Sequence, residues 1–356
     1  MARNKCIGIR EQLTSLVSHQ KLTSIAKNVG LQKRKRKVSP VSLFWTVVLG
    51  FGAGQAKTIA ALRRLYQTMT KTTIVSSSFY DRFTKELTLF FRKVVAELIT
   101  KLAAVRPKYQ GIFKKFEDVF IIDATVVRLH HLLEKKYPST WTNHTKASAK
   151  LSMVICVHDA SPRSIKVTEG RRHECKKFRV GKWISGKLLL FDLGFFKYQL
   201  FDNITRNKGY FISRLKDNAD PLITKTYSRC RGRAIELEGN RLRDIEAGLR
   251  REVIDAEVDV SFKRREYAGK RTKKHQKLRL VGLLNEETKK YHFYVTNIPS
   301  SHLTPEEVGS AYAARWQIEL VFNELKTHYR LGDIESQNVN VAETFLYSAI
   351  VTLYSK

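Results

Sequence analysis

The sequence predicts an α/β protein in which a helical region comes first and a sheet follows. Three observations support this prediction. Apolar residues recur at helical spacing through the first hundred or so residues, continuous apolar runs begin after Arg106 and Pro107, and an amphipathic helix lies near the end. With 356 residues and a hydrophobic content of 43%, the chain is long enough for two or three domains.

Positive charge is the dominant global property of the chain. Lys and Arg outnumber Asp and Glu by 65 to 33, which gives a formal net charge of +32. Nucleic acid is the usual partner of such a surface, and an anionic membrane is the competing one. No stretch approaches the ~20 apolar residues of a spanning helix, and the first residues lack the apolar core of a signal peptide. We therefore expect a cytoplasmic, nucleoid-associated protein that acts on DNA or RNA rather than on a membrane.

The N-terminal region is predicted to be helical. Apolar periodicity marks segments at Glu11–Val17, Leu22–Val29, Val41–Leu49, Thr58–Met69 and Ser77–Leu102, with a break at Gly50–Gly54. A run of five cations precedes the helix-start signal at Ser39 and Pro40. These cations are Lys33, Arg34, Lys35, Arg36 and Lys37. Such a run is often only a solvated loop. At a helix junction it can also neutralise several phosphates, and we assign it to DNA binding.

Two of the predicted strands end in an aspartate. Asp123 follows an apolar run at Val119–Ile122, and Asp192 follows one at Lys187–Phe191. Sites in α/β sheets form where buried strands leave the core, so both carboxylates are candidates for a functional site. The alternative for each is a turn former or a helix cap. Further strands are predicted at Leu151–Val157 and Tyr210–Leu215, with a covering helix between residues 196 and 204.

A β-rich segment is predicted between residues 218 and 301. Residues Ile254–Phe262 alternate between apolar and polar side chains, and two further strands follow at Leu278–Leu284 and Tyr291–Val295. Cations crowd the turn between the first two strands, at 263–265 and 270–274. A charged edge that prevents aggregation is one explanation of this tip. DNA contact is the one we favour on so basic a chain.

The helix near the end of the chain combines an apolar face with a narrow polar seam. At about 100° per residue, Tyr312, Arg315, Glu319, Asn323 and Lys326 fall within an arc of about 80°. The seam sets one carboxylate among an Arg, a Lys and a Tyr. This pattern suits a carboxylate aimed at a metal or phosphate, with cations that hold a polyanion. The alternative is ordinary i, i+4 pairing of Arg315 with Glu319.

The spacing of these side chains resembles a known signature. Tyr312-x2-Arg315-x3-Glu319-x6-Lys326 is similar to the Tyr-Arg-Glu-Lys motif of the DDE transposases of the insertion-sequence-4 family. Four residue types at three fixed spacings make this the most specific part of the resemblance. The resemblance extends from about Leu22 to the last residue.

Two upstream segments extend the resemblance. Asp123-Ala-Thr and Asp192-Leu-Gly-Phe, with Phe211–Lys216 downstream, resemble the segments around the two aspartates of the family. The implied fold is a ribonuclease H-like core, a mixed sheet with flanking helices, together with a β-rich insertion. The implied domains are a helical DNA-binding domain at 1–110, the first part of the core at 111–217, the insertion at 218–301 and the catalytic helix at 302–356.

The resemblance also implies a chemistry. Asp123, Asp192 and Glu319 would be the catalytic metal ligands, because three carboxylates can hold two divalent ions about 3.5–4 Å apart. Ligands that offer only oxygen suit Mg²⁺ or Mn²⁺. Tyr312, Arg315 and Lys326 of the signature would bind phosphates of the DNA strand that is cut or joined. The implied enzyme cleaves double-stranded DNA at the ends of an insertion sequence, transfers the strands to a target, and works as a homodimer assembled on DNA.

Two alternatives remain open from the sequence. A metal-dependent nuclease would use the same carboxylates without strand transfer. A catalytically silent DNA-binding copy would bind ends and cut nothing. The second alternative arises because the chain stops at Val351–Lys356, soon after the signature helix, whereas relatives usually continue with helices that pair two protomers. A shortened, catalytically silent copy is therefore kept as an alternative to the full enzyme.

Overall fold

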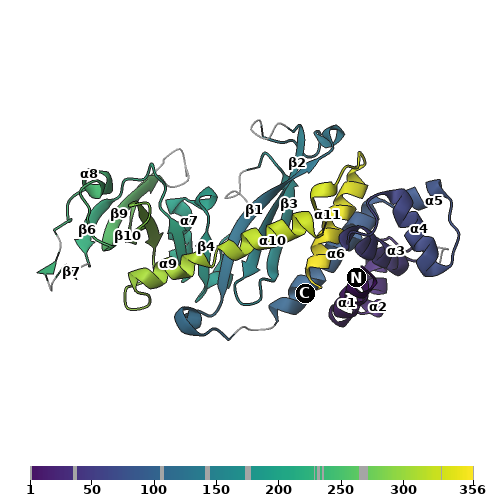
Figure 1. Cartoon of the computed structure of the whole chain (residues 1–356), viewed down its shortest axis with the longest axis horizontal. Coiled ribbons are helices and arrows are strands. Elements are labelled where there is room, and N and C mark those ends of the chain that lie inside the picture. The colour runs from purple at the N-terminus through teal and green to yellow at the C-terminus, as the bar shows by residue number, and fades with distance from the viewer. Residues whose placement is uncertain are drawn as a thin grey trace.

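The computed structural model describes residues 2–34, 38–104, 108–140, 145–172, 178–227, 229–230, 233–234, 236–263, 272–329 and 331–355. The molecule is elongated, with the N-terminal helices at one end and strands reaching the other (Figure 1). The last helix of the chain lies beside the N-terminal helices (Figure 1). Across the described ranges, every helix is too short or too polar to span a bilayer.

The N-terminal region is helical, as predicted. Its helices are α1 (Ala2–Leu16), α2 (His19–Asn28), α3 (Pro40–Val47), α4 (Ile59–Thr70), α5 (Ser76–Tyr80) and α6 (Lys85–Ala103). Ser39, Thr58 and Thr84 cap α3, α4 and α6, because each hydroxyl accepts a hydrogen bond from a backbone N–H three residues on. The single helix expected over Ser77–Leu102 is wrong, since α5 ends at Tyr80 and a new helix begins after the Thr84 cap.

The helix ends within the glycine-rich stretch, as the sequence predicts, although not at its first glycine. α3 continues into a π-helix at Val48–Gly52, and a turn follows at Ala53 and Gly54. A Cβ on Gly50 would clash with Leu62 of α4, and one on Gly52 would clash with Thr352 of the last helix. The glycines therefore let neighbouring helices approach closely, which is a packing role that periodicity alone does not reveal.

Among the described residues, nine strands form one sheet in the order β3-β2-β1-β4-β5-β11-β10-β9-β6. Their bounds are β1 (Val119–Leu129), β2 (Ala147–Cys156), β3 (Pro162–Glu169), β4 (Leu188–Phe191), β5 (Tyr210–Arg214), β6 (Leu222–Thr226), β9 (Val253–Lys263), β10 (Lys273–Leu284) and β11 (Tyr291–Thr296). β4 runs parallel to both β1 and β5, and the other neighbours are antiparallel. Two short strands, β7 (Arg229–Cys230) and β8 (Arg233–Ala234), pair separately.

Strand β1 is longer than the sequence predicts, which changes the place of Asp123. The strand was expected to end just before this residue, but it continues along β2 as far as Leu129. Its parallel pairing with β4 does end there, at Ile122 opposite Phe191. Asp123 and Asp192 are therefore the first residues beyond the paired part of two adjacent strands, although only Asp192 follows the end of a strand.

The predicted strands of the β-rich segment join the same sheet. β11 pairs with β5, and β10, β9 and β6 follow outward. A buried ion pair links β10 to β9: Arg279 Nε lies 2.7 Å from Asp255 Oδ1, and Arg279 Nη2 lies 2.9 Å from Oδ2. Arg279 also donates to the carbonyl of Leu303 at 2.8 Å, which ties these strands to the chain just before α9. The division of the chain into four segments stays a prediction.

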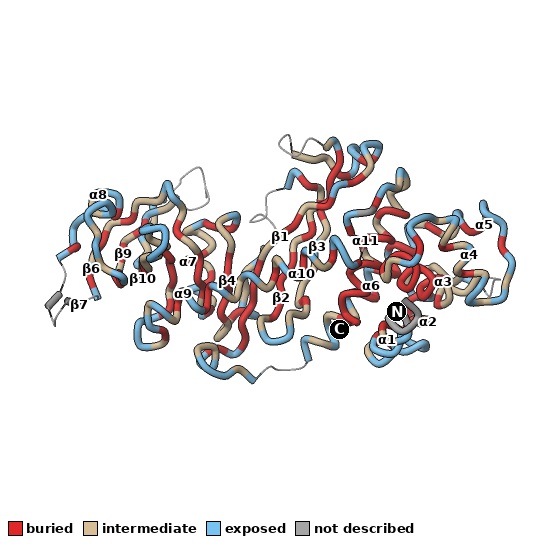
Figure 2. The backbone as a smooth tube through the Cα atoms, viewed as in Figure 1, coloured by how far each residue is buried: buried red, intermediate tan, exposed pale blue. Residues whose placement is uncertain are grey.

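Helices pack on both faces of the sheet. α10 (Trp316–Thr327) packs on one face and α7 (Tyr198–Arg206) on the other, while the short α8 (Leu242–Glu246) lies near β6. Alternate residues of β1 belong to two apolar clusters, with Ile121 on the α10 side and Phe120 on the α7 side. Figure 2 shows buried residues along these strands and along the last helix.

The helix predicted to carry the polar seam is two helices. α9 (Pro305–Ala313) and α10 lie nearly end to end (Figure 1). At the junction, the backbone N–H groups of Ala314 and Arg315 bond three residues back instead of four. This tighter turn leaves Arg315 at the N-cap of α10 and Glu319 in its first turn.

The last helix, α11 (Val339–Leu353), packs among the N-terminal helices. The Phe345 ring stacks on Phe51 with centroids 4.1 Å apart. The Ser348 hydroxyl donates to the carbonyl of Val47 at 3.1 Å. The chain just after the signature helix therefore completes the core of the N-terminal region.

Candidate active site

One pocket brings together the three carboxylates singled out in the sequence. Asp123, Asp192 and Glu319 line a cavity of about 440 Å³. Asp123 points from β1 to the α10 side, Asp192 follows β4, and Glu319 projects from the first turn of α10. The other lining residues are Ala124, Thr125, Arg315, Phe322, Asn323 and Lys326. Carboxylates from distant parts of the chain thus share one cavity with two cations.

Arg315 bridges two of these carboxylates. Its Nη2 lies 2.6 Å from Glu319 Oε1, and its Nη1 lies 3.6 Å from Asp123 Oδ2. The Arg315 and Asp123 side chains are only 17% and 16% exposed, so salt screens their attraction less than that of a surface pair. The i, i+4 pairing that the sequence left open is present, and the second contact extends it to β1.

The pocket has the donor chemistry that a hard divalent cation requires, since all three candidate ligands are carboxylates. Within the described residues, no three Asp, Glu, His or Cys side chains stand close enough to form a ready metal cluster. The Arg315 guanidinium instead contacts Asp123 and Glu319 itself. A divalent ion and Arg315 would therefore compete for the same oxygens.

Tyr312 lies behind the pocket and is not among its lining residues. It is 7% exposed, and its hydroxyl donates to the carbonyl of Phe191 at 3.2 Å. Burial raises the pKa of the Tyr312 hydroxyl to about 12. The Arg315 guanidinium lies over its ring, 5.8 Å from the centroid. Tyr312 thus supports Arg315, and the phosphate contact expected of it stays a prediction.

Lys326 lines the pocket further along α10. Its burial, and then the charge of nearby Arg128 on β1, lower the pKa of Lys326 below its usual value. Positive charge is therefore concentrated where α10 passes β1. Such a place favours an anion, because a bound phosphate would offset the repulsion between the two cations.

Comparison with known proteins decides the family. The sequence pattern described as the transposase DDE domain matches residues 114–354. The chain belongs to the DDE transposases. It is a DDE-type transposase enzyme, so the resemblance seen in the sequence is confirmed, and membership implies dependence on a divalent metal.

Relatives of this transposase match it over most of its length. It is 23% identical to the transposase for insertion sequence element IS231F of Bacillus thuringiensis subsp. israelensis, over 97% of this chain and 78% of the relative. It is also 23% identical to the transposase for insertion sequence element IS1151 of Clostridium perfringens, over 76% of this chain and 62% of the relative. A solved piggyBac transposase synaptic complex with hairpin DNA aligns with 98% of this chain and 73% of its own, with a TM-score of 0.47 and 10% identity.

Two lining residues of the pocket, and one residue near Lys326, received no role from the sequence. Thr125 shares a face with Asp123, because side chains two residues apart on a strand point the same way. Asn323 lies in the polar seam, and its position could have indicated a lining role. Arg128 is brought near Lys326 by the fold, and no local pattern could have revealed it.

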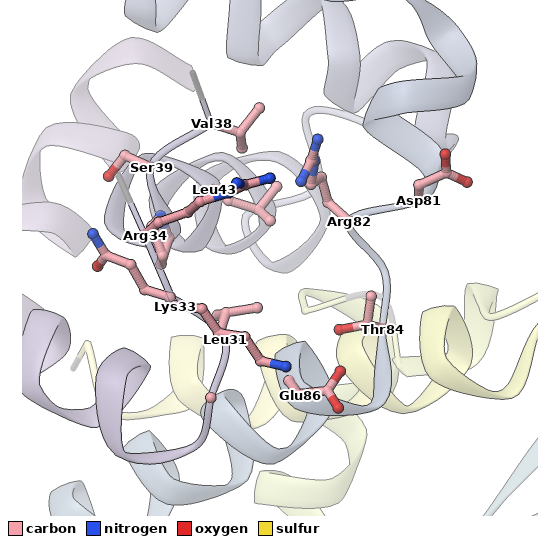
Figure 3. Close-up of a pocket in the computed structure, with 13 residues that line it drawn as sticks. Leu31, Lys33, Arg34, Val38, Ser39, Leu43, Asp81, Arg82, Thr84 and Glu86 are labelled. Atoms are coloured by element: carbon pink, nitrogen blue, oxygen red, sulfur yellow. The ribbon is translucent and has the colours of Figure 1, made fainter. Parts of the chain in front are cut away.

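Part of the basic run of the transposase lines a second pocket, among the N-terminal helices. Lys33 and Arg34 line this cavity of about 460 Å³, and Arg82 contributes a third cation (Figure 3). Figure 3 shows Arg34 and Arg82 on the same side of the cavity and Lys33 extending toward Glu86. The Thr84 hydroxyl, and to a smaller extent Lys33, lower the pKa of Glu86.

Other cations assigned to DNA fall outside the described residues. These are Lys35, Arg36 and Lys37 of the basic run, and Arg264, Arg265, Lys270 and Arg271 of the hairpin tip. Their contact with DNA stays a prediction.

Proposed function

We propose that this transposase moves an insertion sequence by binding the element ends, cutting their DNA strands, and joining the freed 3′ ends to a target. In this proposal Asp123, Asp192 and Glu319 are the catalytic residues of both steps. The observation that carries the proposal is the meeting of these three carboxylates with Arg315 and Lys326 in one pocket. The names of the relatives support it, since both are transposases for insertion sequence elements.

Mg²⁺ is the proposed metal, with Mn²⁺ as the alternative. Asp123, Asp192 and Glu319 present only oxygen donors, which these ions prefer. When bound, two such ions activate water or a 3′-hydroxyl and stabilise the leaving oxygen. The carboxylates serve both cleavage and strand transfer, because neither step needs a covalent protein nucleophile.

The cations of the pocket hold the strand during these steps. Arg315 moves from the carboxylates to a phosphate, which its planar fork can bind through two hydrogen bonds. Lys326, which lines the same pocket, holds a second phosphate further along α10. Tyr312 keeps Arg315 beside the carboxylates through the ring contact.

The catalytic part has a ribonuclease H-like fold in this proposal. The antiparallel strands β3, β2 and β1 are joined by the parallel strands β4 and β5 in one mixed sheet. Helices α10 and α7 flank its two faces. This arrangement supports the fold that the resemblance implies.

Double-stranded DNA, as element ends and as target, is the proposed partner. Lys33, Arg34 and Arg82 lie in the loops between the N-terminal helices and outnumber the two carboxylates of their pocket, Asp81 and Glu86. This pocket and the catalytic one share no lining residue, so end binding and cleavage use different surfaces. Two protomers assemble as a homodimer on two ends. The net charge of +32 supports residence on the nucleoid.

Glu319→Gln tests the proposal. The change keeps the size of the side chain and removes the charge that holds a divalent ion. Cleavage should fall beyond the roughly 10- to 100-fold loss that follows changes around a metal ligand, while binding to element ends survives. Glu306→Gln, an exposed residue of α9 outside the pocket, is the control. The assay uses end-labelled DNA and a target plasmid in Mg²⁺ and in Ca²⁺.

The products separate the candidate functions. Joined products from the wild type support a transposase, cut but unjoined DNA indicates a nuclease, and binding without cutting indicates a silent copy. The ligand role of Glu319 fails if Glu319→Gln cuts normally, or if it loses as much binding as Lys326→Ala.

A further inference from the structure

A third cavity lies on the face of the sheet opposite the catalytic pocket. Phe120 and Val154 line it, and both belong to the apolar cluster on the α7 side, whereas Asp123 points to the α10 side. α7 packs over β5 and β9, so the β2 and β3 end of this face is left to the cavity. Its volume of about 380 Å³ is large enough for a small ligand.

The lining of this cavity is basic. Its four cations are Arg163, Lys166, Arg179 and Lys187. Among the described lining residues, Asp118 is the one carboxylate, and it is 9% exposed. Asp118 accepts hydrogen bonds from the Tyr109 hydroxyl at 2.7 Å and the Cys156 thiol at 3.4 Å, so its charge is engaged inside the protein. Arg163 is paired with Asp159, which lies outside the lining, at 3.1 Å. Even when this carboxylate is counted, the cations of the cavity outnumber the carboxylates, so the cavity favours an anion.

Trp183 adds an aromatic surface to these cations. It lines the cavity and is still 42% exposed. Its indole N–H donates to the carbonyl of Arg179 at 3.2 Å, and its ring centroid lies 6.1 Å from those of Phe120 and Phe178. Lys187 donates to the Trp183 carbonyl. The ring is held in place while part of its surface stays open, as a stacking platform for a base requires.

We propose that this cavity is a further nucleic-acid site, which takes an unpaired nucleotide of single-stranded DNA. The base stacks on Trp183, and the phosphates lie against Lys166, Arg179 and Lys187. A paired base does not offer its face to the ring, so duplex DNA does not bind in this way. The inference rests on the proposed function, because strand cleavage is what creates unpaired nucleotides near the protein.

Protein occupants are less suited to the cavity. A second copy of this chain also carries a net charge of +32, so two such basic faces repel one another. An acidic protein segment has the right charge, but it does not use the open aromatic surface of Trp183. It is therefore kept as an outcome of the test.

The test measures binding of a fluorescent oligo(dT) of roughly 12 nucleotides, within the span of known single-strand sites, by anisotropy. Unlabelled duplex is present in excess to fill the double-strand sites. Trp183→Ala should weaken binding roughly 5- to 150-fold, the cost of one lost stacking contact, and Trp183→Phe should restore most of it. Arg179→Ala should weaken binding and lower the slope of log affinity against log salt by about 0.7.

Two matched controls make the test specific. Lys182→Ala removes an equal charge from the same segment but not from the cavity lining, and Trp316→Ala removes an exposed Trp on the catalytic side. The proposal is overturned if Lys182→Ala weakens binding as much as Arg179→Ala, or if Trp316→Ala weakens it as much as Trp183→Ala. It is also overturned if Arg179→Ala and Trp183→Ala both bind like wild type. It is also overturned if poly-glutamate displaces the oligonucleotide from wild type but not from Trp183→Ala, because the site then takes acidic protein.

A cleavage assay distinguishes failure of the single-strand site from failure of the proposed function. Trp183→Ala should cleave duplex element ends like wild type, since Trp183 is on the other face of the sheet. If the wild type cleaves no ends but binds oligo(dT) through Trp183, the single-strand site stands and the proposed cleavage fails. If ends are cut while the cavity variants change nothing, only the single-strand site is refuted.

Discussion

Arg315→Ala is expected to make the transposase less stable without metal and more responsive to Mg²⁺. In the structure, Arg315 contacts Glu319 at 2.6 Å and Asp123 at 3.6 Å. Its removal leaves Asp123, Asp192 and Glu319 in one pocket without their shared guanidinium. Like charges that line one cavity repel each other, so the folded state should lose free energy.

The size of the loss follows from the burial of the partners. A hydrogen bond to a charged group contributes about 1.5–3 kcal/mol, but Glu319 is 36% exposed and water screens part of its interaction. We therefore expect a loss of about 1–3 kcal/mol for Arg315→Ala in chelator. Mg²⁺ at 100 times its dissociation constant stabilises a folded site by about 2.7 kcal/mol, which would offset most of this loss.

Thermal unfolding in chelator and across a Mg²⁺ titration measures both effects. Wild type should respond less to Mg²⁺ than Arg315→Ala, because the ion has to displace the guanidinium. Arg172→Ala is the control: it removes an ion pair with Glu169 at 3.2 Å, outside the pocket, and should not alter the Mg²⁺ response. An equal Mg²⁺ response in wild type and Arg315→Ala would refute the competition between the ion and Arg315.

Three further outcomes follow from the charges. Replacing Lys33 and Arg34 with Gln should lower the slope of log end-binding affinity against log salt by about 1.8, and an unchanged slope would show that neither contacts phosphate. Burial and Arg128 lower the pKa of Lys326, so it loses its charge at a lower alkaline pH than surface lysines do. DNA binding by wild type should therefore weaken before that of Lys326→Arg as pH rises, and parallel profiles would contradict this. Arg279→Ala removes the guanidinium that pairs with the buried Asp255 carboxylate and should cost about 3–5 kcal/mol in urea unfolding. A cost under about 1 kcal/mol would mean that the pair is solvated.

The sequence predicted those parts of the site that local patterns encode. Apolar runs located the strands before Asp123 and Asp192, because a buried strand needs apolar residues on both faces. Helical periodicity placed Arg315 and Glu319 side by side. The motif spacing indicated the family, and the family match over residues 114–354 includes the motif.

Features that depend on contacts between distant segments could not be predicted. The extension of β1 past Asp123 along β2 is not one of them, because the β-branched residues Thr125, Val126 and Val127 favour a strand and carried that signal in the sequence. The tight turn at Ala314 and Arg315 divides a segment whose periodicity is that of one helix. The contact between Arg315 and Asp123, which sets up competition with a metal, exists only after α10 has packed against β1.

The position of α11 has a consequence for biosynthesis. The Thr88 hydroxyl on α6 donates to the carbonyl of Asn340, 252 residues away, and Ser348 reaches Val47 across 301 residues. Such high contact order delays folding, because these contacts form only after the final helix has left the ribosome. Until then, apolar faces of the first helices lack their cover and are open to aggregation or to chaperones. A ribosome that stalls before Val339 should therefore yield a chain whose N-terminal helices remain incompletely packed, although every residue of the catalytic pocket has already been made.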